Sequence, residues 1–394
     1  MSERKSDISG WLVRPASWHL WALLAAVLGA TTVRTTRVTR DGGMDNAIVV
    51  RAARTWLEGG SPYDDPHFLY LPGAVLAAAP QALLTPAALR VLVPLAVTAC
   101  LAAGWVCALL LHRVPLRSRL AALGLAGLTA GFAPFAHLIL LANWTATAAL
   151  ALPLGLLLAS RGRWAAAAVV LGTAIALKPV LVPAALLFVF AGRWRALALL
   201  IALPATASAV AALLLPDPTG FFTRTLPFLL RGDDDFVRLY EASPAAVLPR
   251  LGVPQGPAAL LALVAAAAGV ACAYRRWRRA DAGPLRFTET AAALMLSAFL
   301  VSRPSYDHYL VIVVPLLLAS LPCAGSVARS PWFWLALVPQ LPGLSWPYLE
   351  PVQRRAFKDA LTLCVLAGTV AGHGWAGRRE PGVKSSPVQA ATSF

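Results

Sequence analysis

Long apolar stretches separated by short, mostly basic loops make up most of this chain. Apolar runs of about 18 residues or more are long enough to cross a bilayer as helices, and these runs lack the alternation of polar and apolar positions that marks strands. Lipid offers no partners for free backbone groups, so a spanning segment must be helical or part of a closed barrel. The pattern predicts an all-α, polytopic integral membrane protein with about twelve spans.

The positions of the predicted segments follow from the same pattern. One transmembrane domain is expected over residues 1–376, followed by a disordered cytoplasmic tail at 377–394. The longer apolar segments lie at 18–33, 86–111, 196–215, 257–274, 287–301, 309–322, 331–346 and 360–374. Two shorter segments, 47–57 and 71–84, are predicted to be helices that lie in the membrane interface.

Four more apolar segments are short, at 120–132, 145–159, 164–177 and 180–190. The last two meet at Lys178 and Pro179, which allows two interpretations. Residues 164–190 form either a hairpin of two short helices or one proline-kinked span with Lys178 at its centre, where a charge costs about 2.5–3.5 kcal/mol. Basic turns at 161–163 and 193–195 favour the hairpin, because both turns then face the cytoplasm.

The net charge of +16 does not indicate nucleic acid in a chain that is 58% hydrophobic. Most of the surplus falls on the side expected to be cytoplasmic, so the basic runs at 275–279 and 378–379 are interpreted as topology signals. The apolar run at 18–33 lacks a signal-peptide cleavage site and is expected to be a retained first span. The five cysteines lack metal-ligand spacing and are expected to be small buried residues, not disulfides.

A polar segment at 41–73, called the polar island below, interrupts the apolar pattern. It combines carboxylates with aromatic residues: Asp41, Asp45, Glu58, Asp64 and Asp65 beside Tyr63, His67, Phe68 and Tyr70. None of these side chains is needed to cross a bilayer. The segment is therefore expected to carry chemistry.

Alternating sides at each predicted span brings polar residues of at least five loops to the outer face. They are Asp45, Tyr63, Asp64, His67, Tyr70, Asn143, Lys178, Arg224, Arg303, Asp307 and His308. Cations can hold a phosphate and a carboxylate can accept a proton from an attacking hydroxyl, so the set suits an anionic, lipid-linked substrate.

Motif absences narrow the function further. The sequence contains no GxxxxGK[ST], HExxH, GxSxG or GxGxxG motif, which argues against an ATP-driven pump, a zinc protease and a nucleotide-binding enzyme. A lipid-linked glycan transporter stays open as an alternative, because broken helices also line transport sites.

Several motifs within residues 40–325 resemble the C-class, polyprenol-phosphate-sugar-dependent glycosyltransferases of family 87. The polar island carries Asp45 before a helical segment, GGSPYD at 59–64 and FLYLP at 68–72. LANW at 141–144 resembles the family's asparagine turn, and LKPVLVPAALLFVFAGRWRAL at 177–197 resembles its Lys-Pro segment. DPTGFFTRTLPFLL at 217–230, with DPHFLYLPG at 65–73, resembles the branch that adds alpha-1,3 arabinofuranosyl branch points to mycobacterial arabinan.

Two stretches depart from that branch. SRPSYDH at 302–308 is closer to the Ser-aromatic-His turn of mannosyl members, and the sequence from 232 to 252 differs from the arabinosyl pattern. A mannosyltransferase that uses polyprenyl-phosphomannose is therefore the alternative within the family.

The resemblance implies a multi-pass enzyme of the plasma membrane with its active site on the extracytoplasmic face. It would move arabinofuranose, with inversion, from decaprenyl-phosphoryl-arabinofuranose to an arabinan acceptor in arabinogalactan or lipoarabinomannan synthesis. Its partners would be this donor, the glycan acceptor and membrane lipid, with no nucleic acid. No cofactor is expected and no metal is required, because cationic side chains can balance the leaving phosphate.

The resemblance also assigns roles to single residues. Asp45 is the expected general base, with a helix N-cap as its alternative interpretation and Asp41 as a reserve base. Lys178 is the expected first phosphate ligand and His308 the second, although each could be an interfacial side chain that reaches toward water.

Arg224 and Arg303 are expected to contact donor phosphate or lipid phosphate. Sugar or acceptor contacts are expected from Tyr63, Asp64, His67, Tyr70 and Asn143. The alternatives are turn chemistry for Asp64 and an interfacial aromatic belt for the rings. A metal site at Asp233–Asp235 is a weaker alternative.

Overall fold

The computed structural model describes residues 2–39, 42–231, 239–279, 283–346, 348–349, 351 and 354–375. The described part of the chain is helical and contains no strand beyond an isolated bridge between Pro15 and Ser118. This confirms the all-α prediction. The expected tail at 377–394 lies outside the described residues.

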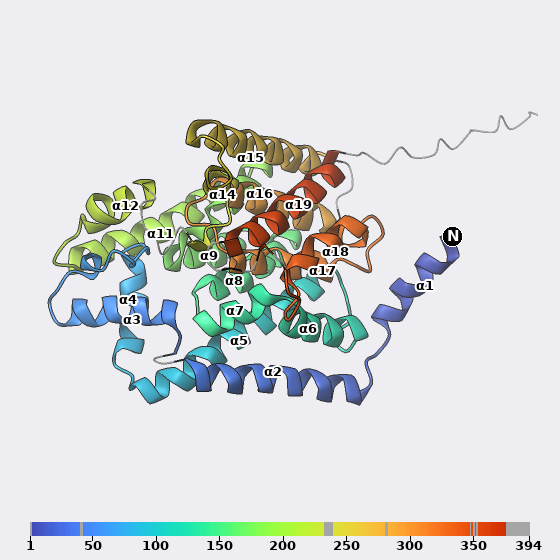
Figure 1. The fold of residues 1–394 in the computed structure, drawn as a ribbon, viewed down its shortest axis with the longest axis horizontal. Helices are drawn as coiled ribbons and strands as arrows, with labels where there is room; N and C mark the ends of the chain where they lie inside the picture. The colour runs from blue at the N-terminus through green and yellow to red at the C-terminus, as the bar shows by residue number, and fades with distance from the viewer. Residues whose placement is uncertain are drawn as a thin grey trace, which may run out of the picture.

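The elements below carry the labels of Figure 1. The first third of the chain contains α1 Ser2–Val13, α2 Trp18–Val38, α3 Met44–Leu57, η1 Pro62–Asp64, α4 Gly73–Ala82, α5 Pro86–Leu111, α6 Arg119–Gly131, α7 Ala133–Leu141 and α8 Thr145–Ser160. The middle contains α9 Trp164–Leu177, η2 Pro179–Ala184, α10 Ala185–Phe190, α11 Trp194–Leu214, η3 Phe221–Thr225 and α12 Leu226–Arg231. The last third contains α14 Pro244–Arg250, α15 Gln255–Trp277, α16 Pro284–Val301, η4 Asp307–Ile312, α17 Val314–Ala319, η5 Val327–Arg329, α18 Pro331–Leu337, η6 Val338–Gln340 and α19 Arg355–Trp375.

Four described helices are long and apolar enough to cross a membrane: α5, α11, α15 and α16. A fifth span results if α6 and α7, which meet at a bend of 73°, are counted together. These helices, with the family assignment below, indicate a membrane protein, but the count of about twelve spans is not confirmed. The apolar residues Leu213 of α11 and Leu260 of α15 point outward, as lipid-facing side chains do.

Two predicted spans are not continuous helices. Over 331–346, the α-helix stops at Leu337 and a 3₁₀ turn ends at Gln340, because Pro339 and Pro342 each lack a backbone donor. Over 309–322, a 3₁₀ helix gives way to the six-residue α17, with Pro315 near its start. Apolar composition therefore predicted helix length wrongly in both segments.

Residues 164–190 form the predicted hairpin. Helix α9 ends at Leu177, and Lys178 is extended before η2 begins at Pro179. The Trp164 ring at the start of α9 packs against Phe188 of α10, with ring centroids 5.3 Å apart. Since the two ends of the segment are adjacent, the chain reverses at Lys178, and the single kinked span is excluded.

The remaining short segments largely match their predictions. The interfacial pair appears as α3 and α4, segment 120–132 as α6, and segment 145–159 as α8. All five cysteines are free, as expected, but only Cys272 is buried and Cys364 is exposed. The exposed thiol lies on a helix surface that composition alone could not distinguish from the core.

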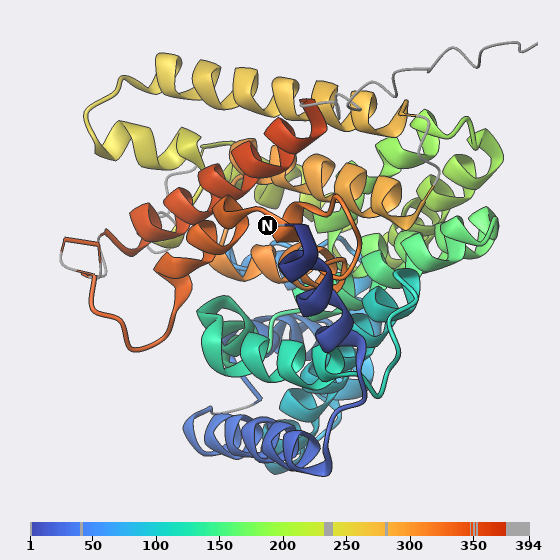
Figure 2. The ribbon, with the colours of Figure 1, turned by 90° about the vertical axis from the view of Figure 1, so that its right-hand side faces the viewer.

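The basic run at 275–279 has a packing role that its interpretation as a topology signal missed. Arg276 and Glu289 form a buried ion pair between α15 and α16, with Nε and Oε2 2.6 Å apart. Arg279 donates to the carbonyl of Gly374, and Arg275 lies 3.9 Å over the Trp375 ring. The run therefore anchors the end of α19, whose long diagonal course is visible in Figure 2.

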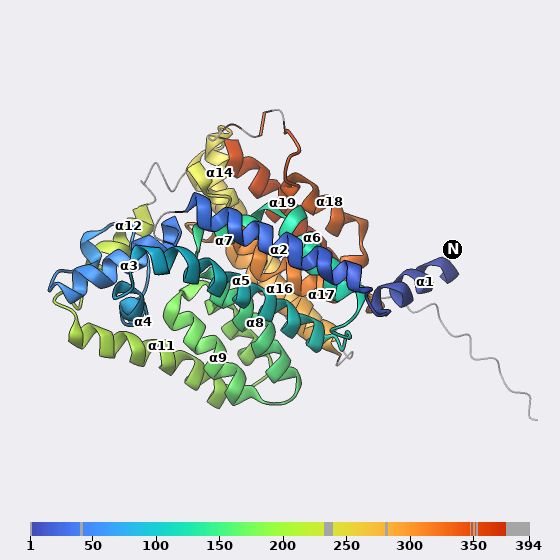
Figure 3. The same cartoon turned by 90° about the horizontal axis from the view of Figure 1, so that it is seen from below.

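The arrangement places the polar island at one end of the molecule. Figures 1 and 3 show α3, α4 and α12 grouped there, with α1 at the opposite end. Figures 1 and 2 show α2 and α15 on opposite edges of the bundle. The island therefore covers one end of the helices that carry Asn143 and Lys178.

A close helix contact holds α5 against α8. A Cβ atom at Gly104 would lie 2.4 Å from the carbonyl oxygen of Ala149, so only glycine permits this approach. We expect Gly104→Ala to destabilise the protein by about 1–3 kcal/mol through overpacking. Gly127→Ala is the matched control, because open space surrounds that helical glycine. Thermal unfolding of both variants in detergent tests this, and an equal midpoint for the two would contradict it.

Candidate active site

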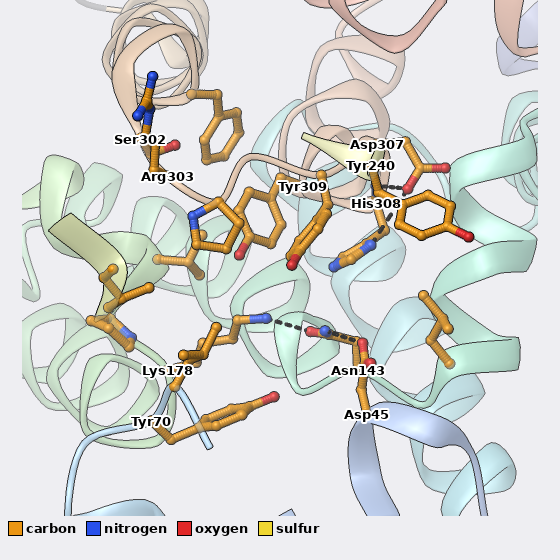
Figure 4. A pocket seen from close by; sticks show the side chains of 18 of the residues that line it. Asp45, Tyr70, Asn143, Lys178, Tyr240, Ser302, Arg303, Asp307, His308 and Tyr309 are labelled. Atoms are coloured by element: carbon orange, nitrogen blue, oxygen red, sulfur yellow. Dashed lines mark hydrogen bonds and ion pairs between the residues drawn. The ribbon is translucent and has the colours of Figure 1, made fainter. Parts of the chain in front are cut away.

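A cavity of about 820 Å³ lies beneath the polar island. Its walls come from α3, the 67–70 segment, the turn before α8, the turn between α9 and η2, the 302–309 segment and α19. Leu141, Val180, Val182 and Pro183 supply an apolar part, while charged and amide side chains gather in another part. Figure 4 shows the polar side chains that point into this space.

Local backbone geometry brings Asp45 to Asn143. Helix α7 ends at Ala142 in the left-handed conformation, which turns the chain and presents Asn143. Gly43, with φ of 119°, precedes α3, and a Cβ there would lie 2.6 Å from the Ala142 Cβ. Glycine therefore permits α3 to start directly against the turn before α8.

Asn143 connects a carboxylate to an ammonium (Figure 4). Its Nδ2 donates to Asp45 Oδ2 at 2.5 Å, and its Oδ1 accepts from Lys178 Nζ at 2.6 Å. The Oδ1 atom also accepts from the backbone N–H of Thr145 at 2.8 Å. Asp45 lies in the first turn of α3, whose N-cap is Gly43, so its interpretation as an N-cap is wrong.

Lys178 is enclosed by acceptors and rings. Its Nζ donates to Thr145 Oγ1 at 3.0 Å and lies 5.7 Å from the Tyr70 ring centroid and 5.1 Å from that of Tyr309. Burial lowers the pKa of Lys178 to about 8, an effect that the negative charge of Asp45 opposes. The ammonium is therefore present at neutral pH and is lost as the pH rises through about 8.

A second charged cluster forms around Asp307. Its Oδ2 accepts from His137 Nδ1 at 2.6 Å and from Arg355 Nη2 at 3.3 Å. Its Oδ1 accepts from the backbone N–H of His308 at 2.7 Å. Asp307 thus holds Arg355 and the 307–308 turn at the cavity wall.

His308 is buried among aromatic rings. It stacks on Tyr306 with centroids 5.3 Å apart and meets the Tyr309 ring edge to face at 5.1 Å. Its Nδ1 lies 3.5 Å from Asp307 Oδ1, and within the described residues its Nε2 has no hydrogen-bond partner. A buried imidazole in this state can donate to or accept from a bound molecule.

The structure brings most of the predicted site residues together. The cavity of Figure 4 is lined by Asp45, His67, Tyr70, Asn143, Lys178, Arg303 and His308. Three others, Tyr63, Asp64 and Arg224, line a second cavity of about 560 Å³. Asp41 and Asp233–Asp235 lie outside the described residues.

Some predicted residues are already engaged. Arg303 Nη2 donates to the carbonyl of Ala245 at 2.9 Å, so part of its guanidinium holds α14. His67 Nδ1 lies 3.2 Å from Asp65 Oδ1, which also lies near Arg51. Both residues still line the cavity.

Several polar residues near the site were not predicted, among them Arg355, Asp359 and His137. Arg355 and Asp359, from the start of α19, line the cavity, and His137 of α7 supports Asp307 behind it. Arg355 and Asp359 come just before the segment 360–374, which was predicted to be a span. His137 lies inside an apolar run. The only available signal was charge next to an apolar segment, which also occurs at the end of any span.

A model of glycosyltransferase family 87 matches residues 68–303. Searches among curated proteins and among solved structures give no significant match. The family model covers more than half of the chain, and this protein therefore belongs to glycosyltransferase family 87. It is a membrane glycosyltransferase, which uses a sugar donor and an acceptor.

The ionisation of Lys178 can be observed directly. The chain contains four lysines, Lys5, Lys178, Lys358 and Lys384. After reductive ¹³C-methylation, we expect the signal assigned through Lys178→Arg to titrate with a midpoint of about 8, because burial disfavours the ammonium. NMR between pH 6 and 11 measures this. A midpoint above 10 for Lys178 would contradict the buried site.

Proposed function

We propose that this protein transfers arabinofuranose from decaprenyl-phosphoryl-arabinofuranose to an arabinan acceptor, forming alpha-1,3 branches of cell-envelope arabinan with inversion at the anomeric carbon. The observation that carries the proposal is that Asp45 and Lys178 share one cavity and are joined through Asn143. A base and a phosphate-binding cation in one cavity are the two groups that this transfer needs.

Asp45 acts as the general base. The acceptor hydroxyl attacks the anomeric carbon on the face opposite the phosphate, and its proton passes to the Asp45 carboxylate. The new bond joins the acceptor oxygen to the anomeric carbon, and the bond from that carbon to the phosphate oxygen breaks. The electron pair leaves with decaprenyl phosphate, and the carboxylate also favours the positive charge that develops on the sugar.

Asn143 positions both partners of the reaction. The hydrogen bond from its Nδ2 fixes one oxygen of Asp45 and thereby orients the carboxylate in the cavity. Its carbonyl oxygen and the Thr145 hydroxyl hold the Lys178 ammonium, which has a further N–H for the phosphate. The two charges are thereby kept apart by one amide and stay available to substrate.

The apolar part of the cavity suits a polyprenyl chain. Leu141, Val180, Val182 and Pro183 line it beside Lys178. Burial of apolar chain surface contributes about 25 cal/mol per Å², so a lipid-linked donor gains affinity there that a free sugar phosphate cannot. Such a donor fits an active site on the extracytoplasmic side of the plasma membrane, which is part of the proposal.

The choice of arabinose rests on the resemblance of 65–73 and 217–230 to the arabinosyl branch. One observation favours mannose instead. The Ser305–His308 turn, which resembles that of mannosyl members, puts a buried His308 on the cavity wall, with its Nδ1 beside Asp307 and its Nε2 unpartnered among the described residues. Polyprenyl-phosphomannose is therefore the second candidate donor, and all the roles above apply to it unchanged.

Purified protein in nanodiscs, given radiolabelled donor and a linear arabinan oligosaccharide, tests the function. We expect labelled glycan from decaprenyl-phosphoryl-arabinofuranose, with a 3-linked branch in linkage analysis. Asp45→Asn should lower kcat by about a hundredfold or more, because a general base contributes about 10²–10⁴. Glu58→Gln, on an exposed carboxylate of the same island, is the control and should remain active.

Other outcomes separate the alternatives. Product only from polyprenyl-phosphomannose would replace the arabinosyl assignment with the mannosyl one. No product from either donor, with movement of the donor across liposomes, would favour a transporter. Turnover near the wild-type rate in a folded Asp45→Asn variant would remove Asp45 from the mechanism.

Donor affinity should depend on the charge of Lys178. Lys178→Ala is expected to raise KM for the donor by about ten- to a hundredfold, the value of one charged hydrogen bond, with less effect on acceptor KM. In the wild type, donor KM should rise as the pH passes about 8, because the ammonium is lost. Lys178→Arg keeps its charge and should remove this rise. Steady-state kinetics between pH 6.5 and 9.5 measure both effects, and a KM change confined to the acceptor would refute the assignment.

A further inference from the structure

A second, smaller cavity separates three of the predicted site residues from the rest. It has a volume of about 560 Å³ and is lined by Tyr63, Asp64, Pro66, Thr223, Arg224, Thr225, Pro227 and Phe228. Within the part of the chain that the structure describes, its walls come from two segments, the polar island and the η3–α12 segment. These segments lie about 160 positions apart in the sequence and meet here.

Packing between the two segments is close and specific. The rings of Tyr63 and Phe221 meet edge to face with centroids 6.4 Å apart. A Cβ at Gly220 would lie 2.6 Å from the Tyr63 ring, so glycine is required at this contact. The Thr225 hydroxyl donates to the carbonyl of Phe68 at 3.4 Å. The cavity therefore has fixed walls on the side of the island.

The charges of this cavity do not suit a phosphate. Arg224 contacts two carboxylates, forming an ion pair with Asp64 and one with Asp217, the latter at 3.3 Å. Arg224 and Asp64 line the cavity, and Asp217 lies beside it in contact with Arg224. Among the described residues, this trio of side chains carries one positive and two negative charges. An anion would meet a net negative charge, so Arg224 is not suited to bind the donor phosphate.

The same groups suit a neutral sugar. A carboxylate paired with a guanidinium places hydrogen-bond acceptors next to donors. Two neighbouring sugar hydroxyls can donate to the first and accept from the second. Asp64 and Arg224 keep about half of their side-chain surface exposed, at 61% and 49%. Pro227 and Phe228, which are partly exposed, add apolar surface on which a sugar ring can pack.

Aromatic rings connect this cavity to the catalytic one. Tyr63 borders the smaller cavity and Tyr70 the larger. Between them lies the buried Phe68, 5.4 Å from the Tyr63 ring and 5.6 Å from the Tyr70 ring. The two cavities therefore border opposite ends of one short aromatic segment.

We propose that the smaller cavity is an acceptor subsite, which binds a neutral glycan residue of the acceptor other than the one whose hydroxyl reacts. The inference rests on the proposed function for the identity of the glycan. It removes Arg224 from the donor site and assigns it, with Asp64, to the acceptor. It further implies that the enzyme distinguishes acceptors by length, because only a long glycan reaches both cavities.

Kinetics with two acceptors test the subsite. Linear arabinofuranose oligosaccharides, a disaccharide and an octasaccharide, serve as probes with the same donor. Asp64→Asn and Arg224→Gln should each lower kcat/KM for the octasaccharide by about tenfold. They should leave kcat/KM for the disaccharide and KM for the donor within about twofold of the wild type. Glu58→Gln, which lies outside both cavities, should leave kcat/KM unchanged for both acceptors.

A second variant guards against a purely structural effect of losing the ion pairs. Thr223→Trp fills the cavity from an exposed position and leaves Arg224, Asp64 and Asp217 in place. It should cause the same selective loss for the octasaccharide. Equal losses for both acceptors, or a rise in donor KM in Arg224→Gln, would overturn the subsite.

The subsite can also be tested without turnover. Saturation-transfer NMR should show the octasaccharide bound to the wild type and weakly bound to Arg224→Gln and Thr223→Trp. If the wild type transfers no arabinose but binds the octasaccharide in this way, the proposed donor fails and the subsite stands. The opposite outcome is that the wild type transfers arabinose and the variants bind the octasaccharide as tightly as the wild type. That outcome would refute the subsite and support the proposed function.

Discussion

A lysine ammonium in a cavity with apolar walls must be neutralised, because burying an unpaired charge costs far more than one hydrogen bond contributes. A direct ion pair between Lys178 and Asp45 would meet that need and leave both groups occupied by each other. The Asn143 amide stabilises both charges without a direct ion pair. Its oxygen accepts a hydrogen bond from Lys178, and its NH₂ group donates one to Asp45. Each charge is stabilised by an oriented dipole and keeps capacity for a substrate.

Several features of the fold serve this amide. The left-handed Ala142 turns the chain so that Asn143 faces the cavity, and Gly43 lets α3 approach that turn. The hairpin of α9 and α10 reverses at Lys178, which puts the ammonium at a vertex and not in the middle of a helix. The Trp144 indole donates to Asn46 at 2.9 Å and fixes α3 beside α8. Four chain segments thus converge on one side-chain amide.

The polar residues of this chain divide into two cavities with different charge. The larger one contains Lys178 and Arg355 and is flanked by an apolar wall, a combination suited to a lipid-linked phosphate. In the smaller one, Arg224 is paired with Asp64 in the lining and with Asp217 beside the cavity, a combination suited to neutral hydroxyls. The aromatic residues of the polar island stand between the two. The two cavities differ because their cations have different ion-pair and hydrogen-bond partners. Those partners cannot be read from the sequence.

The sequence by itself determined the all-helical membrane class and the boundaries of α5 and α9, and it favoured the hairpin at Lys178. These follow from local composition and from charge near apolar segments, which act over a few residues. Only the tertiary structure decided that Arg224 belongs to a separate cavity, and that Arg355, Asp359 and His137 lie at or behind the wall of the larger one. Those outcomes depend on contacts between residues that are distant in the chain, such as His137 with Asp307 across 170 positions. A hydrogen bond forms wherever donor and acceptor lie about 3 Å apart in space, however far apart the two residues are in the sequence. A pattern among neighbouring residues therefore cannot predict it.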